Sequence, residues 1–389
     1  MRADAFVDSV GVNVHLHYMD TSYAKFPEVE SALKELGVRH IRDQIADGSW
    51  PDYVDRLNAL GREGIKAILT AHVKESDATV VGYAKLVHDS IEGYEGPNEY
   101  DLGDHPDWAG TLNTFFARTC RAIKADPLAS QYPIIAPPVV KSQSYAMISS
   151  TRDCADYGNL HNYFGGHNPG TRGWGDNAYG SYEWNLNNAS RAWENKPILS
   201  TETGYFNDLA KDGGVPENVS AKYMPRLLFE QQMHGIKRTY IYEMVDVGAK
   251  EKFHDATFGL LHADYSRKPA FRTVRGVLHV LSDPGSAFQP GSLEFTLGGS
   301  TENLKHFLLQ KRNGTYYLAI WVEESGFDVK SKRETPIAPR GITIKTREPM
   351  KFTVHRFDDD GHLTESSLGS GSSQTLQVDD HVLILEMGK

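Results

Sequence analysis

The amino-acid sequence predicts an α/β fold: a (β/α)8 TIM barrel followed by a C-terminal antiparallel β-sandwich. From about residue 10 to residue 282, short β-like runs alternate with amphipathic helical stretches. Eight such repeats are typical of a closed barrel of parallel strands. No GxGxxG segment follows the first strand, which argues against a dinucleotide-binding open sheet. After residue 283 the pattern changes to strands alone.

The eight predicted barrel strands are apolar or alternating runs, each followed by a helix or a helix-bearing loop. They lie in VGVNVHLHY (10–18), HIRDQI (40–45), IKAILTAH (65–72), SIEGYEGPNE (90–99), PIIAPPVV (133–140), YGNLHNYF (157–164), PILSTETGY (197–205) and RTYIYEMVD (238–246). The helices between them have apolar residues at helical spacing, and the first, 26–37, ends at a glycine stop. A long glycine-rich loop, 164–184, follows the sixth strand.

The Pro/Gly/Ser-rich stretch 283–292 marks the expected domain junction. Beyond it, Asn313-Gly314 and DDDGH (358–362) predict turns between strands. The predicted strands are SLEFTL (292–297), KHFLLQK (305–311), TYYLAIWV (315–322), GITIK (341–345), KFTVHRF (351–357) and HVLILEM (381–387). We therefore expect a barrel over residues 1–283 and a β-sandwich over residues 284–389.

Composition limits the classes of function. Hydrophobic residues make up 40% and charged residues 24% of the 389 residues, which is typical of a globular protein. The net charge of −10 argues against a nucleic-acid partner, because such a partner requires a basic surface. No run of about 18 apolar residues occurs, so we expect no membrane partner.

Two further features concern the cellular compartment. The start, MRADAFVDSVGV, lacks the apolar centre of a signal peptide, but Met1 could equally follow a removed signal. Cys120 and Cys154 are the only cysteines, too few for a disulfide framework or a zinc site. We expect both to be small buried residues, with a single bridge between them left open.

Polar residues gather where the barrel strands end, and in a TIM barrel this edge carries the active site. They are His15, His17, Arg42, Asp43, His72, Asn98, Glu99, His161, Asn162, Tyr163, Glu202, Tyr242, Glu243 and Asp246. Glu99 and Glu202 end the fourth and seventh strands, so both carboxylates can face one cleft. Such a pair suits hydrolysis of a glycosidic bond, which requires one proton donor and one nucleophile or base.

The pair Asn98-Glu99 and the later Glu202 resemble the clan A glycoside hydrolases. The resemblance implies that Glu99 is the acid/base, that Glu202 is the nucleophile and that configuration is retained. Arg42 in GVRHIRD matches the arginine that pairs with the nucleophile, and Asn98 matches the residue that binds the sugar 2-hydroxyl. Tyr163 in LHNY resembles the aromatic residue beside the nucleophile.

Within this clan, a barrel followed by a sandwich is most similar to family 39, and FGLLHADYSRKPAF (258–271) resembles the approach to the last barrel helix in families 5 and 39. The sequence departs from the clan in YEMVD, where many members have a tryptophan platform. The resemblance implies a poly- or oligosaccharide substrate, no metal and no organic cofactor. With the acidic composition and the tryptophan-bearing loop, we expect an extracellular or periplasmic location. Carboxyl groups about 5–5.5 Å apart would indicate retention, and about 6.5–9.5 Å inversion.

Other residues have competing interpretations. Trp174 and Trp184 lie in the 164–184 loop, and we expect them to shape a cleft. His17, His72, His161, Tyr242 and Glu243 are further candidates for substrate contact, although His72 and His161 could be satisfied core histidines and Glu243 a supporting partner. Arg42 could instead form a rim salt bridge with Asp43 or Glu63. We interpret Glu95 as structural, because Gly-Pro follows it.

Two other classes of function remain open from the sequence. His15 and His17 resemble the HxH of metal-dependent amidohydrolases, and Glu99, His161 and Asp246 could complete a ligand set, but the strand-five histidine is absent. A non-catalytic carbohydrate-binding barrel is the second alternative. It predicts that one glutamate is replaced, and both are present.

Overall fold

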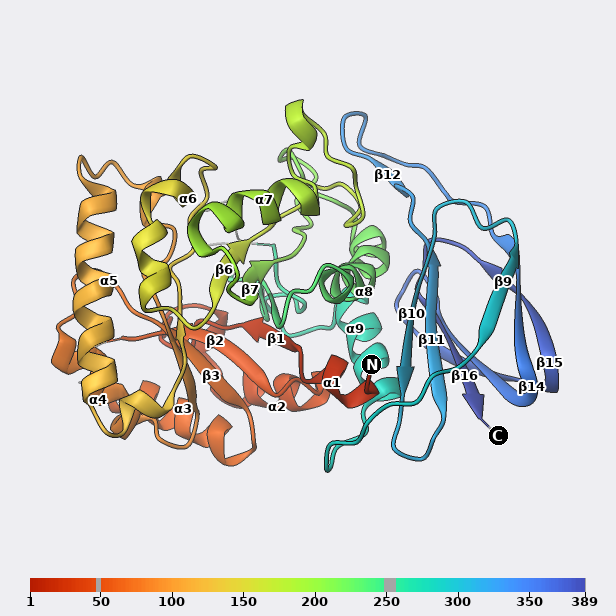
Figure 1. Cartoon of the computed structure of the whole chain (residues 1–389), viewed down its shortest axis with the longest axis horizontal. Helices are drawn as coiled ribbons and strands as arrows, with labels where there is room; N and C mark the ends of the chain where they lie inside the picture. The colour runs from red at the N-terminus through yellow and green to blue at the C-terminus, as the bar shows by residue number, and fades with distance from the viewer. Residues whose placement is uncertain (47–49, 248–256, 389) are drawn as a thin grey trace.

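The computed structural model describes residues 1–46, 50–247 and 257–388. It has a barrel at one end and an antiparallel β-domain at the other (Figure 1). Between these two parts lie two barrel helices, α8 (Glu217–Met233) and α9 (Pro269–Leu281).

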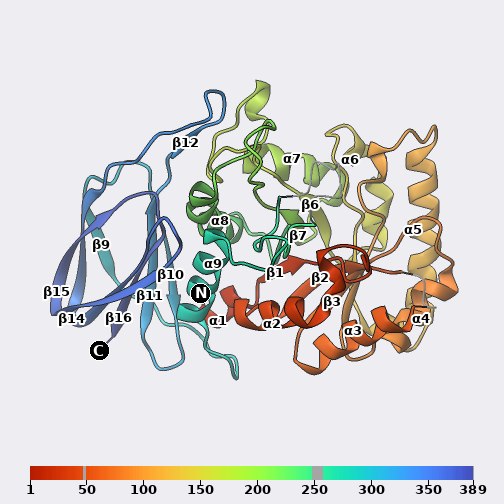
Figure 2. The same cartoon turned by 180° about the vertical axis from the view of Figure 1, so that it is seen from behind.

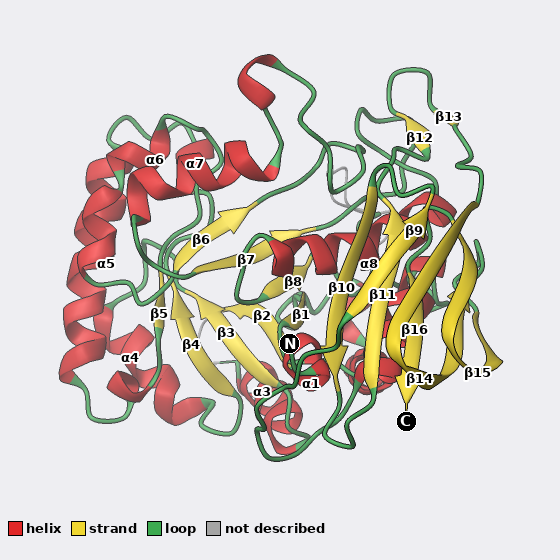
Figure 3. Ribbon diagram, turned by 45° about the vertical axis from the view of Figure 1, so that its right-hand side comes forward, coloured by secondary structure: helices red, strands yellow, loops and turns green. Residues whose placement is uncertain are grey.

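Eight parallel strands form the barrel, in the order β5-β4-β3-β2-β1-β8-β7-β6. A parallel bridge between Ile135 and Tyr157 joins the two ends of this order and closes the sheet. The strands are β1 (Val10–Asn13), β2 (His40–Gln44), β3 (Lys66–Thr70), β4 (Ile91–Glu95), β5 (Ile134–Ile135), β6 (Gly158–His161), β7 (Ile198–Thr203) and β8 (Thr239–Ile241). Figure 3 shows them converging inside the ring of helices.

The helices cover the barrel because each buries one apolar stripe. In α2 (Phe26–Leu36) the buried residues Val29, Leu33 and Leu36 recur every three to four positions, and the helix ends at Gly37 with φ +83°. The remaining barrel helices are α3 (Pro51–Arg62), α4 (Asp77–Leu86), α5 (Trp108–Ala125), α6 (Ser144–Met147) and α7 (Tyr182–Trp193). No helix in the described ranges combines the length and apolar character that crossing a bilayer requires.

Several strands end earlier than the sequence predicts. β1 ends at Asn13, so His15 and His17 lie in the following loop, and β4 ends at Glu95, so Asn98 and Glu99 follow the strand. β5 contains only two residues. Pro137 and Pro138 have no N–H to donate to a neighbouring strand, which explains why it is so short.

The C-terminal domain is an antiparallel β-sandwich with strand order β10-β11-β16-β14-β15, and β9 pairs with β14 off this path. The strands are β9 (Phe295–Gly299), β10 (Leu304–Gln310), β11 (Tyr316–Val322), β14 (Arg340–Phe357), β15 (Leu363–Val378) and β16 (Leu383–Gly388), with a small ribbon of β12 (Phe327–Asp328) and β13 (Arg333–Glu334). The turns at Gly314 and Gly361 have positive φ, as the sequence predicts.

Three elements differ from the sequence prediction. GITIK and KFTVHRF belong to one long strand, β14, whose register shifts between Lys345 and Met350. Its partner β15 is rich in Ser and Gly and mostly exposed, so it carries little apolar pattern. A short N-terminal helix, α1 (Ala3–Val7), precedes β1 and packs Phe6 against Phe229 with ring centroids 4.3 Å apart.

The barrel and the sandwich share an apolar contact. Phe229 of α8 packs on Trp321 of β11, with ring centroids 5.7 Å apart. The start of the chain also contacts the sandwich, because the backbone N–H of Gln310 donates to the Met1 carbonyl. Figure 2, the view from behind, shows α8 and α9 beside the sandwich strands. The two parts therefore pack directly against each other.

Candidate active site

A cavity of about 530 Å³ opens at the carboxyl ends of the barrel strands. Its polar lining comes from β1, β2, β3, β7 and the loops that follow the strands. The residues that line it are Asn13, Val14, His15, Tyr18, Arg42, Asp43, Gln44, Thr70, Asn98, Glu99, Leu102, Val140, Tyr163, Gly165, Gly166, Glu202, Gly204, Tyr205, Phe206, Gly213, Tyr242 and Phe258.

Arg42 of β2 forms hydrogen bonds with two carboxylates, those of Glu95 and Glu202, and with two asparagine side chains. Its Nη1 donates to Glu202 Oε1 at 2.6 Å and to Asn13 Oδ1 at 3.0 Å. Its Nη2 donates to Glu95 Oε1 at 2.6 Å and to Asn98 Oδ1 at 2.7 Å. Burial lowers the pKa of this guanidinium, but the charges of Glu95 and Glu202 outweigh it, so the pKa is raised and Arg42 stays a cation.

Glu202, on β7, is held from two sides. Arg42 donates to one carboxylate oxygen, and the Tyr163 hydroxyl donates to the other at 2.9 Å. Burial would raise the pKa of Glu202, but the charges of His161 and Arg42 outweigh it and lower the pKa, so the group is ionised near neutral pH. Burial and the charge of Glu202 raise the pKa of Tyr163 well above its usual range, so its hydroxyl remains a donor.

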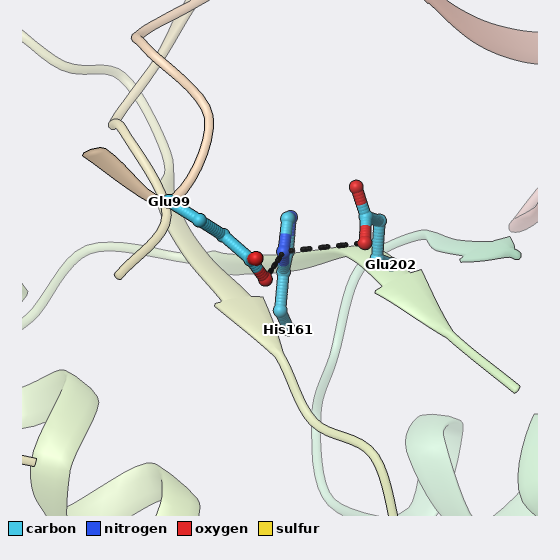
Figure 4. A group of neighbouring side chains, drawn as sticks. All are labelled: Glu99, His161 and Glu202. Carbon is cyan, nitrogen blue, oxygen red and sulfur yellow. Dashed lines mark hydrogen bonds and ion pairs between the residues drawn. The ribbon is translucent and has the colours of Figure 1, made fainter. Parts of the chain in front are cut away.

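His161 lies between the two glutamates (Figure 4). Its Nδ1 is 2.6 Å from Glu99 Oε1 and 3.5 Å from Glu202 Oε2, and its Nε2 is 3.0 Å from Thr201 Oγ1. A carboxylate oxygen of Glu99 and one of Glu202 lie within 4.8 Å of each other. Burial lowers the pKa of His161, but the charge of Glu202 and the hydrogen bond to Glu99 together raise it by more. The pKa of His161 is therefore raised overall.

Glu99 has an unusual backbone conformation for a residue with a side chain. Its φ is +42° and its ψ is 38°, in the left-handed region. Such conformations cost free energy and gather at functional sites. Here the conformation lies just past β4 and accompanies a side chain that reaches His161, which fits a residue held in place for chemistry.

The structure brings together most of the residues that the sequence singles out. Arg42, Asn98, Glu99, Tyr163, Glu202 and Tyr242 line the cavity, and the buried side chain of His161 lies between the two glutamates. His17, His72, Trp174, Trp184 and Glu243 are not among the lining residues. Trp174 instead stacks on His167 within the loop, and Trp184, in the first turn of α7, contacts Tyr179.

Two residues of the site have roles that sequence reasoning missed. Asn13, the last residue of β1, accepts from Arg42 and donates through Nδ2 to the Thr201 carbonyl at 3.0 Å. Glu95 is a buried partner of Arg42 as well as a strand end. A signal existed for Asn13: a polar residue inside an apolar barrel run must find a buried partner.

The HxH arrangement does not assemble a metal-ligand set. His15 lines the cavity, whereas His17 Nδ1 is 3.1 Å from Asp43 Oδ1. Asp246 pairs with Lys268 at 2.9 Å. In the described part of the chain, two groups could hold a metal ion: Glu99, His161 and Glu202, and Asp379, Asp380 and His381. Neither contains His15, His17 or Asp246.

Comparisons with known proteins place the fold. No protein-family model matches the chain, and no curated protein matches it. A monomeric β-xylosidase from Caulobacter crescentus CB15 aligns with a TM-score of 0.64 and 13% identity, over 99% of this chain and 96% of that chain. A family 39 glycoside hydrolase from Bacteroides cellulosilyticus WH2 aligns with a TM-score of 0.59 and 12% identity, over 100% and 82%.

A third structure agrees with these two. A glucosidase from Croceicoccus marinus aligns with a TM-score of 0.61 and 13% identity, over 92% of this chain and 91% of that chain. The fold is shared with family 39 glycoside hydrolases. Because the alignments run through both parts of the chain, the likeness includes the barrel and the sandwich in the same order.

Proposed function

We propose that this protein is a retaining glycoside hydrolase that acts on a poly- or oligosaccharide, with Glu99 as acid/base and Glu202 as nucleophile. The observation that carries the proposal is the approach of the two carboxylates to within 4.8 Å between oxygens. Such a close approach favours the retaining arrangement, in which the carboxyl groups lie ~5–5.5 Å apart, over the wider ~6.5–9.5 Å of an inverting enzyme.

In the first step, Glu202 attacks the anomeric carbon while Glu99 protonates the oxygen that leaves. The lowered pKa of Glu202 keeps its carboxylate ionised, and the bonds from Arg42 and Tyr163 fix its orientation. His161 Nδ1, 2.6 Å from Glu99 Oε1, holds the Glu99 carboxyl group in position. In the second step Glu99 removes a proton from water, which attacks the same carbon and frees Glu202.

The comparisons support this class of reaction, since the similar structures are described as a β-xylosidase, a glucosidase and a family 39 glycoside hydrolase. We also propose an extracellular or periplasmic location. The disulfide between Cys120 and Cys154 supports it, because such bonds persist in oxidising compartments.

The test uses aryl glycosides and polysaccharides, with the anomer of the first product followed by NMR. We expect retention of configuration by the wild type. Glu202→Ala should lower kcat by about 10⁴-fold or more, because the nucleophile is removed. Glu63→Ala is the control, since the Glu63 side chain is about half exposed, at 46%, in a surface pair with Lys34. Wild-type turnover by Glu202→Ala, or an inverted product, would contradict the proposal.

A further inference from the structure

A second hollow, of about 510 Å³, lies beside the catalytic cavity. Its described lining comes from the loop after β1 and from the start of α3: His17, Met19, Asp20, Trp50, Pro51 and Asp52. Two large apolar side chains in it face solvent, with Trp50 45% and Met19 38% exposed. Large exposed apolar groups that share one hollow indicate a binding surface.

His17 and the side chains that it contacts form the wall between the hollow and the cavity. His17 lines the hollow, whereas its contacts Tyr18, Asp43 and Gln44 line the cavity. His17 Nδ1 is 3.1 Å from Asp43 Oδ1, and its Nε2 is 2.6 Å from Gln44 Nε2. The Tyr18 ring meets the His17 ring edge-on at 4.3 Å. The hollow and the cavity are therefore neighbours, separated only by His17 and the residues that it contacts.

The backbone of Trp50 is held by the hydrogen bonds that begin helix α3. Trp50 precedes α3, and its carbonyl accepts from the amides of Tyr53 and Val54 at 3.1 and 3.3 Å. Pro51 follows it at the first helical position, where its fixed φ suits the helix start. The backbone beneath the indole is thus fixed by the helix start.

The chemistry of the hollow matches a neutral sugar. A pyranose ring presents C–H groups on its faces and hydroxyls at its rim, so one face can stack on an indole while hydroxyls donate to carboxylates. Trp50 supplies the aromatic face, and Asp20 and Asp52 supply acceptors. No Lys or Arg is among the described residues that line the hollow, so an acidic sugar finds no counter-charge there.

We infer that this hollow binds a second sugar of a neutral oligosaccharide, on the glycone side of the bond that is cut. The inference rests on the proposed function. Glu99 protonates the leaving oxygen, so the leaving group lies toward β4. The hollow lies beside β1 and β2, so it receives the part of the chain that extends away from Glu99.

The experiment compares two aryl glycosides with the same leaving group, a monosaccharide and its disaccharide extended at the nonreducing end. Both carry the sugar that the wild type hydrolyses. We expect Trp50→Ala to lower the ratio of kcat/KM for the disaccharide over the monosaccharide by about tenfold, because the extended sugar loses its stacking surface. Trp50→Phe should retain most of the ratio, since a ring remains.

Leu128→Ala is the control, an exposed apolar residue (51%) that lines neither hollow nor cavity. Using a ratio cancels any general loss of folded enzyme. An unchanged ratio in Trp50→Ala, or a ratio lowered equally by Leu128→Ala, would overturn the inference and leave the proposed function intact. A wild type that hydrolyses no glycoside would instead remove the proposed function, and the inference with it.

Discussion

At the scale of single residues, the guanidinium of Arg42 balances the negative charges of Glu95 and Glu202. Its guanidinium donates to Glu95, Glu202, Asn13 and Asn98 from one planar group. A lysine ammonium has three donors and no planar fork, so it could not replace these contacts. Sequence reasoning paired Arg42 with Glu202 but not with Glu95. The strand β3 lies between β2 and β4, so this second contact depends on barrel curvature, which a local pattern does not contain.

His161 carries the first prediction. His161→Asn should move the acidic limb of the kcat/KM pH profile to higher pH. Burial favours protonation of Glu202, and the charge of His161 is the largest effect that opposes burial and lowers the pKa of Glu202. Without that charge the pKa rises, so Glu202 becomes protonated at a higher pH. The measurement is the profile on an aryl glycoside, since this limb reports an essential base of the free enzyme.

His88→Asn is the matched control, because the His88 side chain is 68% exposed. Its profile should coincide with that of the wild type. If the acidic limb of His161→Asn stayed at the wild-type pH while its rate fell, His161 would act through packing and not through its charge.

At the scale of elements, the apolar pattern predicted the eight strands and the helix faces, because parallel barrel strands are buried on both faces and each helix on one. It did not locate strand ends. At β1 the polar-apolar alternation continues past Asn13 to His17, although parallel pairing stops at Asn13 with Arg42. It also missed β15, whose Ser and Gly residues are held by pairing with β14 and bury few side chains.

The cysteines were expected to be small buried residues, with a bridge left open, and the structure joins them. Cys120 of α5 and Cys154 form a disulfide with Cα atoms 6.4 Å apart, which lies in the usual range. It ties α5 to the segment before β6. Because 34 residues separate the two in sequence, loop closure in the unfolded chain gives about 3–4 kcal/mol of stabilisation.

The second prediction follows from this disulfide. Cys154→Ser should lower the free energy of unfolding by about 3–4 kcal/mol, measured by urea denaturation without reductant. Dithiothreitol should lower the wild-type midpoint toward that of the variant and leave the variant unchanged. A wild-type midpoint that does not respond to dithiothreitol, once loss of the disulfide is confirmed by thiol titration, would contradict a stabilising role.

At the scale of the whole molecule, one buried carboxylate couples the sandwich to the rim of the cavity. Glu323 follows β11 and forms an ion pair with Arg226 of α8, with Arg226 Nε 3.0 Å from its Oε2. It also accepts from Asn168 Nδ2 at 2.7 Å and from the Gly170 amide at 3.0 Å. These residues lie in the loop whose Gly165 and Gly166 line the cavity. The sandwich therefore supports the active-site loop.

The third prediction is that Glu323→Gln lowers the free energy of unfolding at pH 7 by about 3 kcal/mol, because it leaves the guanidinium of Arg226 buried without a counter-charge. We also expect a raised KM, since the loop that borders the cavity loses its anchor. Burial raises the pKa of Glu323, but Arg226 outweighs it and holds the pKa below the ordinary 4.5. The stabilisation is thus present above about pH 4.5 and is lost as pH falls through the lowered pKa.

The pH dependence separates this ion pair from simple packing. The difference in unfolding free energy between wild type and Glu323→Gln should be largest at neutral pH and should shrink in acid, where the wild-type carboxylate takes up its proton. The neighbouring Glu324→Gln is the control, because its side chain is partly exposed (28%) and pairs with Arg340 at the surface. A Glu323→Gln variant within about 1 kcal/mol of the wild type at pH 7, like that control, would show that the ion pair of Glu323 with Arg226 adds little to the joint between sandwich and barrel.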